Sequence, residues 1–181
     1  MNANSMPTRY GRLSIGLHWL MLLLIAAVYA TIELKGNFDK GSAPRELLKH
    51  GHFMLGLGVF ALVWLRLLAH WLGPVPKAAA GARWEHALAI LVKVALYGLM
   101  IGLPLLGWLT LSAAGKPIPF FGLQLPALIA TNKALAGEIK DIHEALAVAG
   151  YGLIGLHAAA ALFHHYIRHD DVLRRMLPQR R

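Results

Sequence analysis

The sequence contains no cysteine and few acidic residues. The absence of cysteine excludes disulfides, iron–sulfur clusters, thiolate zinc sites and covalently attached c-type haem. Charged residues make up 15% of the 181 positions and hydrophobic residues 57%, whereas a soluble domain usually carries about 25% charged residues. The net charge of +9 comes from Lys and Arg at the ends of apolar runs, which indicates contact with lipid headgroups and not with nucleic acid.

Four apolar segments stand out along the chain, at about 13–32, 50–72, 86–112 and 142–166. Each reaches or exceeds the roughly 20 helical residues that cross a hydrocarbon core. A helix satisfies all its backbone hydrogen bonds internally, as lipid requires. We therefore predict an all-α fold, an integral membrane four-helix bundle forming a single domain over 1–181.

Positive charge indicates how the bundle is oriented. An even number of spans places both termini on one side, and arginines gather there. The lysines of the opposite loops are spread over longer segments and mixed with acidic residues. Under the positive-inside rule, both termini are expected in the cytoplasm. The arginines at or near the termini are Arg9, Arg12, Arg168, Arg174, Arg175, Arg180 and Arg181.

Histidine is the unusual polar residue of the apolar segments, because ionisable groups are costly in a bilayer. His143 and His157 lie fourteen positions apart on the fourth segment. At about 100° per residue both side chains face the same way, about 21 Å apart along the helix. His52 lies at the depth of His143, and His18 lies closer to the depth of His157. The pattern predicts two inward-facing histidine pairs.

Two imidazoles at one depth can bind the two axial positions of a haem iron, so we expect two intramembrane haem sites. Hydrogen-bonded structural histidines are the simpler alternative. A proton relay is another, but it would require acidic partners that the spans almost entirely lack. A zinc or copper site is disfavoured because each pair offers only two ligands. His50 would point about 200° away from His52 on a helix, and we assign the ligand role to His52.

Stretches such as RLSIGLHW near the N-terminus and GLHAAAALFHHY near the C-terminus resemble segments of the bacterial cytochrome b561 family. They follow the family's order along nearly the whole chain, and the final stretch, GLHAAAALFHHY, is the most specific. The resemblance includes the HW pair at the end of the first stretch and an arginine fourteen positions after His52. The matching stretches are 12–19, 52–68, 103–108, 142–146 and 155–166.

The resemblance implies a four-helix, multi-pass cytochrome of the bacterial inner membrane with two haem b groups. His52 and His143 would ligate the outer haem, and His18 and His157 the inner one. The form most similar to this sequence is described as a superoxide oxidase. Such an enzyme takes an electron from superoxide at the periplasmic face, releases O2 and passes electrons to ubiquinone.

Further residues are candidates for the two substrates. Lys116 and Lys140 flank the outer site and could attract the superoxide anion, although each also suits a solvated surface. His164 lies two turns after His157 and could supply protons to ubiquinone. Trp19 and Tyr166 could line a quinone slot, but aromatic residues also belong at membrane interfaces.

Two other functions are considered. The chain could be a cytochrome b subunit that links a periplasmic dehydrogenase or hydrogenase to the quinone pool. The short outer loops favour a protein that needs no obligate protein partner. It could instead be a haem-free carrier of protons or metal ions. Lys93, about two turns into the third segment, has no role in the family resemblance, and we interpret it as snorkelling to headgroups.

Overall fold

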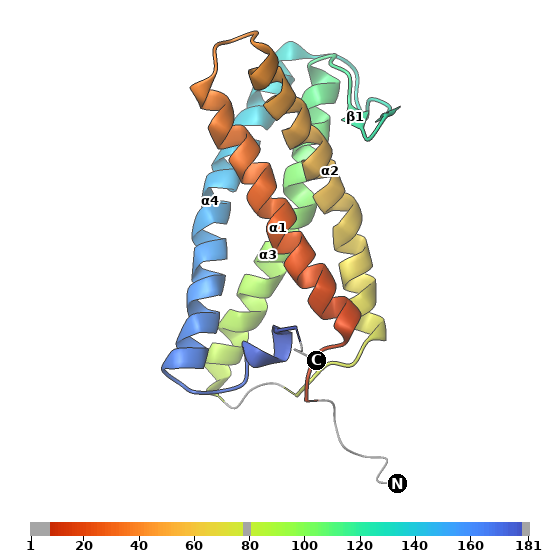
Figure 1. The fold of residues 1–181 in the computed structure, drawn as a ribbon. Helices are drawn as coiled ribbons and strands as arrows, with labels where there is room; N and C mark the ends of the chain where they lie inside the picture. The colour runs from red at the N-terminus through yellow and green to blue at the C-terminus, as the bar shows by residue number, and fades with distance from the viewer. Residues whose placement is uncertain (1–7, 78–80, 179–181) are drawn as a thin grey trace.

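The computed structural model describes residues 8–77 and 81–178. Four long helices run alternately up and down: α1 (Arg12–Leu34), α2 (Ala43–Leu72), α3 (Arg83–Ala113) and α4 (Lys133–Tyr166) (Figure 1). Each is long and apolar enough to cross a membrane. The prediction of a four-helix membrane bundle is confirmed.

Short elements complete the connections. The 3-10 turn η1 (Lys35–Asn37) follows α1, and η2 (Arg174–Met176) follows α4. Between α3 and α4, β1 (Pro119–Phe120) pairs antiparallel with β2 (Leu123–Gln124). The two residues at the tip, Phe121 and Gly122, both have positive φ angles, as the tight turns of two-residue hairpins require.

Two helices begin earlier than the apolar runs predicted. α2 starts at Ala43 and α4 at Lys133, against predicted starts of 50 and 142. The Asn132 side chain caps α4 by accepting a hydrogen bond from the Leu135 N–H (3.1 Å). With 30 and 34 residues, these helices are about 45 and 51 Å long and exceed a 30 Å core. The hydropathy of the sequence predicts where a helix enters the hydrocarbon core. The helices themselves begin earlier, in the polar headgroup layer.

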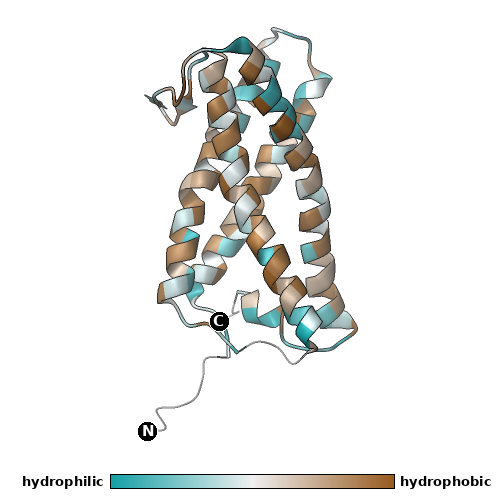
Figure 2. Ribbon diagram, turned by 180° about the vertical axis from the view of Figure 1, so that it is seen from behind, coloured by the Kyte–Doolittle hydropathy of each residue, from teal (hydrophilic) through white to brown (hydrophobic). Residues whose placement is uncertain are grey.

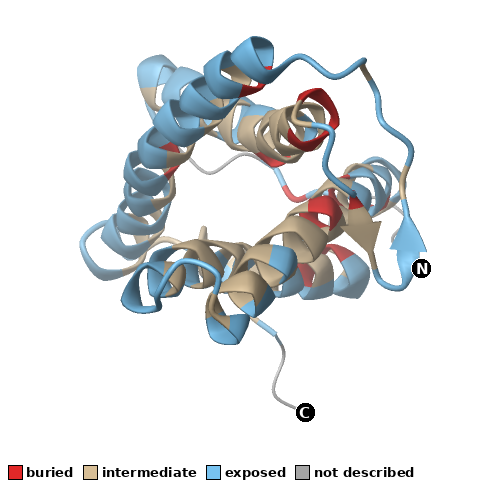
Figure 3. Ribbon diagram, turned by 90° about the horizontal axis from the view of Figure 1, so that it is seen from above, coloured by how far each residue is buried: buried red, intermediate tan, exposed pale blue. Residues whose placement is uncertain are grey.

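The helices pack in a ring with apolar outer surfaces. α1 lies along α2, α2 along α3 and α3 along α4, as the view from above shows (Figure 3). Hydrophobic residues dominate the length of the helices, and hydrophilic residues collect at the two ends (Figure 2). One core cluster joins three helices through Met21, Val59, Val63 and Met100. Exposed groups such as Trp71 (81% exposed) are suited to lipid.

The described ends of the chain lie at one end of the bundle (Figure 1). Arg9 donates a hydrogen bond to the backbone oxygen of Arg174 (2.7 Å), so the two ends touch. The hairpin and the beginnings of α2 and α4 lie at the opposite end. We call the hairpin end outer and the other end inner, following the predicted orientation.

Candidate functional site

The outer half of the bundle brings His52 of α2 to His143 of α4. Their ring centroids lie 6.3 Å apart, and the ring planes make an angle of 75°. His52 Nδ1–H donates to the Val28 carbonyl (3.1 Å), and His143 Nδ1–H donates to the Leu103 carbonyl (3.0 Å). These bonds fix both rings and leave each Nε2 as the atom that can bind a metal.

The inner half brings His18 of α1 to His157 of α4. Their ring centroids also lie 6.3 Å apart, at an interplanar angle of 67°. A different partner holds this pair, because Arg66 Nη2 donates to His18 Nδ1 (2.7 Å). The guanidinium carbon also lies 5.6 Å from the centre of the Tyr97 ring. A fixed positive charge therefore lies beside the inner pair.

The spacing of both pairs fits a haem iron held between two imidazoles. In the inner pair His18 Nδ1 accepts from Arg66, so the proton of the neutral ring is on Nε2 and must be lost before Nε2 can bind iron. An iron bound to one nitrogen of each ring, with bonds of about 2.0 Å, would hold the ring centroids about 6 Å apart. The fourteen-residue interval on α4 separates the pairs by about 21 Å along the helix. The imidazoles meet only in twos: residues 8–77 and 81–178 contain no group of three or more His, Asp or Glu side chains arranged to hold a metal ion.

The neighbouring His50 lies apart from both pairs. It is exposed, and its ring makes an edge contact with Phe53 at 6.4 Å between centroids. His52, by contrast, is half-buried and faces His143. The ligand role of His52 stays a prediction, and His52 is the one of the two that faces His143.

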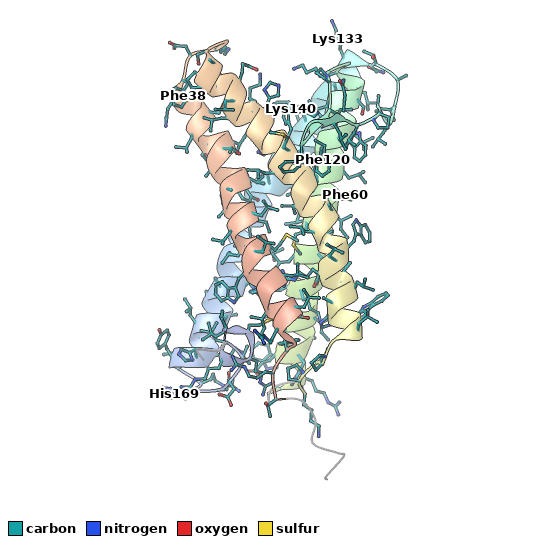
Figure 4. All side chains as sticks on the ribbon, turned by 45° about the vertical axis from the view of Figure 1, so that its right-hand side comes forward. Phe38, Phe60, Phe120, Lys133, Lys140 and His169 are labelled. Atoms are coloured by element: carbon teal, nitrogen blue, oxygen red, sulfur yellow. The ribbon has the colours of Figure 1, made fainter. Side chains whose placement is uncertain are left out.

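The two predicted superoxide lysines differ in their surroundings. Lys116 is exposed and lines a cavity of about 360 Å³ at the base of the hairpin. The connection is fastened there by the Trp108 indole, which donates to the Pro126 carbonyl (3.0 Å). Lys140 forms an ion pair with Glu144 (2.8 Å), with both side chains more than half exposed. Figure 4 shows Lys140 and Phe120 toward the same end of the bundle, opposite His169. Lys140 thus has a partly neutralised charge.

The three predicted quinone residues do not form one cluster. Trp19 makes an edge contact with His18 (5.6 Å between centroids) and donates its indole N–H to the Met176 carbonyl (2.8 Å). His164 is half-buried at the same end. Tyr166 is 66% exposed, and its ring packs on His165 at 4.7 Å between centroids. Trp19 and His164 contact the C-terminal segment, whereas Tyr166 is exposed on the surface of the inner end.

One residue of the inner end is not evident from the sequence. Asp170 Oδ2 accepts a hydrogen bond from His164 Nδ1 (2.5 Å), and its Oδ1 accepts from the Val172 N–H (3.0 Å). Burial acts to raise the pKa of Asp170, but these hydrogen bonds and the positive charge of Arg168 outweigh it and lower the pKa below the usual range. The carboxylate is therefore ionised at neutral pH.

The comparison with known proteins assigns the chain to a family. The model of the family described as prokaryotic cytochrome b561 matches residues 9–179. The chain belongs to the prokaryotic cytochrome b561 family. It is thus a multi-pass protein of the inner membrane, an electron-transfer oxidoreductase that binds haem b.

Curated relatives of this cytochrome b561 span nearly its whole length. Cytochrome b561 homolog 1 of Escherichia coli K12 is 38% identical over 96% of this chain and 99% of its own. A probable superoxide oxidase of Yersinia pestis is 36% identical, over 97% and 99%. Cytochrome b561 homolog 2 of Escherichia coli K12 is 33% identical, over 98% and 95%. The resemblance inferred from the sequence is confirmed.

Proposed function

We propose that this cytochrome b561 carries two haem b groups and transfers electrons from periplasmic superoxide to ubiquinone. The observation that carries the proposal is that each half of the bundle holds two facing imidazoles. In each half their ring centroids lie 6.3 Å apart. A relative described as a probable superoxide oxidase, 36% identical over almost the full length, supports the choice of substrate.

The four histidines would hold the two haem groups, one pair of imidazoles for each group. His52 and His143 would hold the outer group, and His18 and His157 the inner one. When bound, the haems supply one-electron redox chemistry, and the protein supplies ligands and surroundings. The carbonyls of Val28 and Leu103 keep the outer imidazoles oriented, as partners behind a ligand commonly do.

At the outer end the protein would gather a small anion. Lys116 presents a positive charge on the cavity beside the hairpin, and such a charge raises the local concentration of superoxide. Each superoxide gives up one electron and leaves as O2, so no proton-transfer group is required there. Lys140 would contribute less, because Glu144 is its close partner.

At the inner end the acceptor needs protons as well as electrons. One ubiquinone becomes ubiquinol by taking up two electrons, from two superoxide ions, and two protons. His164 is the titratable group we propose to deliver protons, and Trp19 would form one wall of the slot. Tyr166, whose side chain is exposed, would lie on the path by which a membrane-dissolved quinone arrives.

The proposal is tested by supplying superoxide to purified protein together with a short-chain ubiquinone. We expect ubiquinol and O2 in a ratio of one to two, and loss of this activity in His52→Ala but not in His50→Ala. Haem that is reduced by superoxide but not reoxidised by ubiquinone would contradict the assignment of the acceptor. Haem that superoxide cannot reduce would contradict the assignment of the donor.

A further inference from the structure

A short segment after α4 folds back across the inner end of the bundle. We call residues 167–178 the C-terminal cap; it is the blue segment at the base of the bundle in Figure 1. Side-chain hydrogen bonds fasten it to the beginnings of α1 and α3 and to the α2–α3 connection. These run from Trp19 to Met176 O (2.8 Å), from Arg9 to Arg174 O (2.7 Å), from Arg175 to Lys77 O (2.6 Å) and from Arg168 to Glu85 (2.8 Å).

A sharp reversal at the start of the cap returns the chain to His164. His169 has a φ of 53°, in the left-handed region that a non-glycine residue adopts only at some cost. After this turn, the Asp170 N–H donates to the His164 carbonyl (3.1 Å). The backbone bond and the side-chain bond between the same two residues close a small loop. Asp170 is thus held against His164 by main chain and side chain together.

The Asp170 carboxylate has little freedom to turn. Oδ2 accepts from His164 Nδ1, and Oδ1 accepts from the Val172 N–H. Glu85 on α3 is a second carboxylate near His164, but it is engaged by Arg168 (2.8 Å) and by the Ala82 N–H (2.9 Å). Asp170 is therefore the anion that determines which nitrogen of His164 carries a proton.

An ionised carboxylate can only accept a hydrogen bond, so His164 Nδ1 must be the donor. Its Nε2 is then the atom left to exchange a proton with a bound molecule. In the opposite tautomer Nδ1 would present a lone pair to a carboxylate, and the imidazole would turn away. Carboxylates that orient a catalytic histidine act in this way in hydrolases.

We propose that Asp170 is a positioning residue that holds His164 with Nε2 directed to the quinone as its proton donor. This inference rests on the proposed function, because it assumes that ubiquinone is reduced beside His164. In each transfer the Nε2–H bond of the imidazolium breaks and an O–H bond forms on the quinone, which also takes up one electron that originates from superoxide. Neutral His164 keeps its Nδ1–H on Asp170 and regains its Nε2 proton from cytoplasmic water.

The test measures the reoxidation of superoxide-reduced haem by a short-chain ubiquinone in stopped flow. Asp170→Asn can donate to Nδ1 and favours the wrong tautomer. We expect its maximal rate to fall by about 10- to 100-fold, with an unchanged quinone concentration at half-maximal rate. Haem content, haem potentials and the rate of reduction by superoxide should not change, because Asp170 touches neither histidine pair.

The neighbouring Asp171 provides a matched control. It is 66% exposed and lies 3.7 Å from Arg174, so Asp171→Asn removes the same charge without touching His164, and its rate should equal that of the wild type. An equal loss in both variants would overturn the inference in favour of a general effect of charge on the cap. His164→Ala distinguishes the role of Asp170 from the position of the quinone site. If haem reoxidation is slow in His164→Ala but has the wild-type rate in Asp170→Asn, the positioning role alone is overturned. A normal His164→Ala overturns the quinone site as well.

A second measurement does not depend on the folding of Asp170→Asn. The 15N chemical shifts of His164 in the wild-type protein, assigned by difference from His164→Gln, report the tautomer of the neutral ring. We expect the neutral ring to carry its proton on Nδ1. A neutral ring protonated on Nε2 would overturn the proposal.

Discussion

At the scale of single residues, the two histidine pairs differ in what lies behind the rings. His52 and His143 donate to backbone carbonyls, which are neutral. His18 accepts from the guanidinium of Arg66, which carries a full charge at every relevant pH. A positive charge favours the reduced form of a nearby haem, because that form carries one positive charge fewer. The two haems should therefore not be equivalent.

The first prediction concerns Arg66. Arg66→Met is expected to lower the reduction potential of the inner haem by an amount on the order of tens of millivolts. Redox titration followed optically measures the shift. Arg45→Met, at the outer end of the same helix, serves as the control and should leave the inner potential unchanged. Equal potentials in wild type and Arg66→Met would contradict the assigned electrostatic role.

The residue scale also shows what the sequence can predict. The fourteen-residue spacing of His143 and His157 determines their common face from helix geometry alone, and the depths of His18 and His52 then suffice to predict both pairs. The contact of Arg66 with His18 depends on where α2 lies relative to α1, which no local pattern encodes. Asp170 is not predictable in this way, because it reaches His164 only through the reversal at His169.

At the scale of elements, α1 and α4 meet through a close contact in the outer half. The Tyr29 hydroxyl of α1 donates to the Ala147 carbonyl of α4 (2.8 Å), and its ring lies 4.2 Å from the Tyr151 ring, between centroids. Gly150 of α4 faces the Tyr29 hydroxyl, and a Cβ added at Gly150 would lie 2.5 Å from the hydroxyl oxygen. Small residues of this kind let membrane helices approach closely.

The second prediction uses this contact. Gly150→Ala should reduce stability by about 1–3 kcal/mol, because the methyl group forces apart well-packed groups. Gly152→Ala is the matched control, since its Cβ would have nothing within 4 Å, and it should be neutral or slightly stabilising. Thermal unfolding in detergent compares the two variants. A Gly150→Ala protein as stable as Gly152→Ala would contradict the described packing.

Element boundaries are less predictable than element existence. Apolar runs identify four helices because a bilayer requires about 20 apolar residues for each crossing. The polar first turns of α2 and α4 carry no apolar signal, so the sequence prediction starts both helices too late and leaves the Asn132 cap outside the fourth. The C-terminal cap is not predicted either, because side chains bonded to backbone carbonyls more than 150 positions away leave no pattern in the sequence.

At the scale of the whole molecule, charge is divided between the two ends. The sequence has 18 Lys and Arg against 9 Asp and Glu, and several basic side chains at the inner end are bonded to backbone or to acids. At the outer end Lys116 lies beside a cavity, whereas Lys140 is paired with Glu144. The electrostatic attraction of an anion to the outer histidine pair should therefore depend more on Lys116 than on Lys140.

The third prediction follows from this difference. Lys116→Gln should lower the second-order rate constant of haem reduction by superoxide about threefold at low ionic strength, and the effect should shrink as salt is added. Lys140→Gln should have a smaller effect. Pulse-generated superoxide with optical detection of haem measures both. A larger effect at Lys140 than at Lys116 would contradict the proposed steering.

The two histidine pairs are tested most directly by the number of haem b groups per chain, measured as the pyridine haemochrome of purified protein. Two haems are expected in the wild type and in His50→Ala. One haem is expected in His52→Ala, with the inner haem retained, and one in His18→Ala, with the outer haem retained. A single haem in the wild type, or two in both ligand variants, would contradict the assignment of the two histidine pairs.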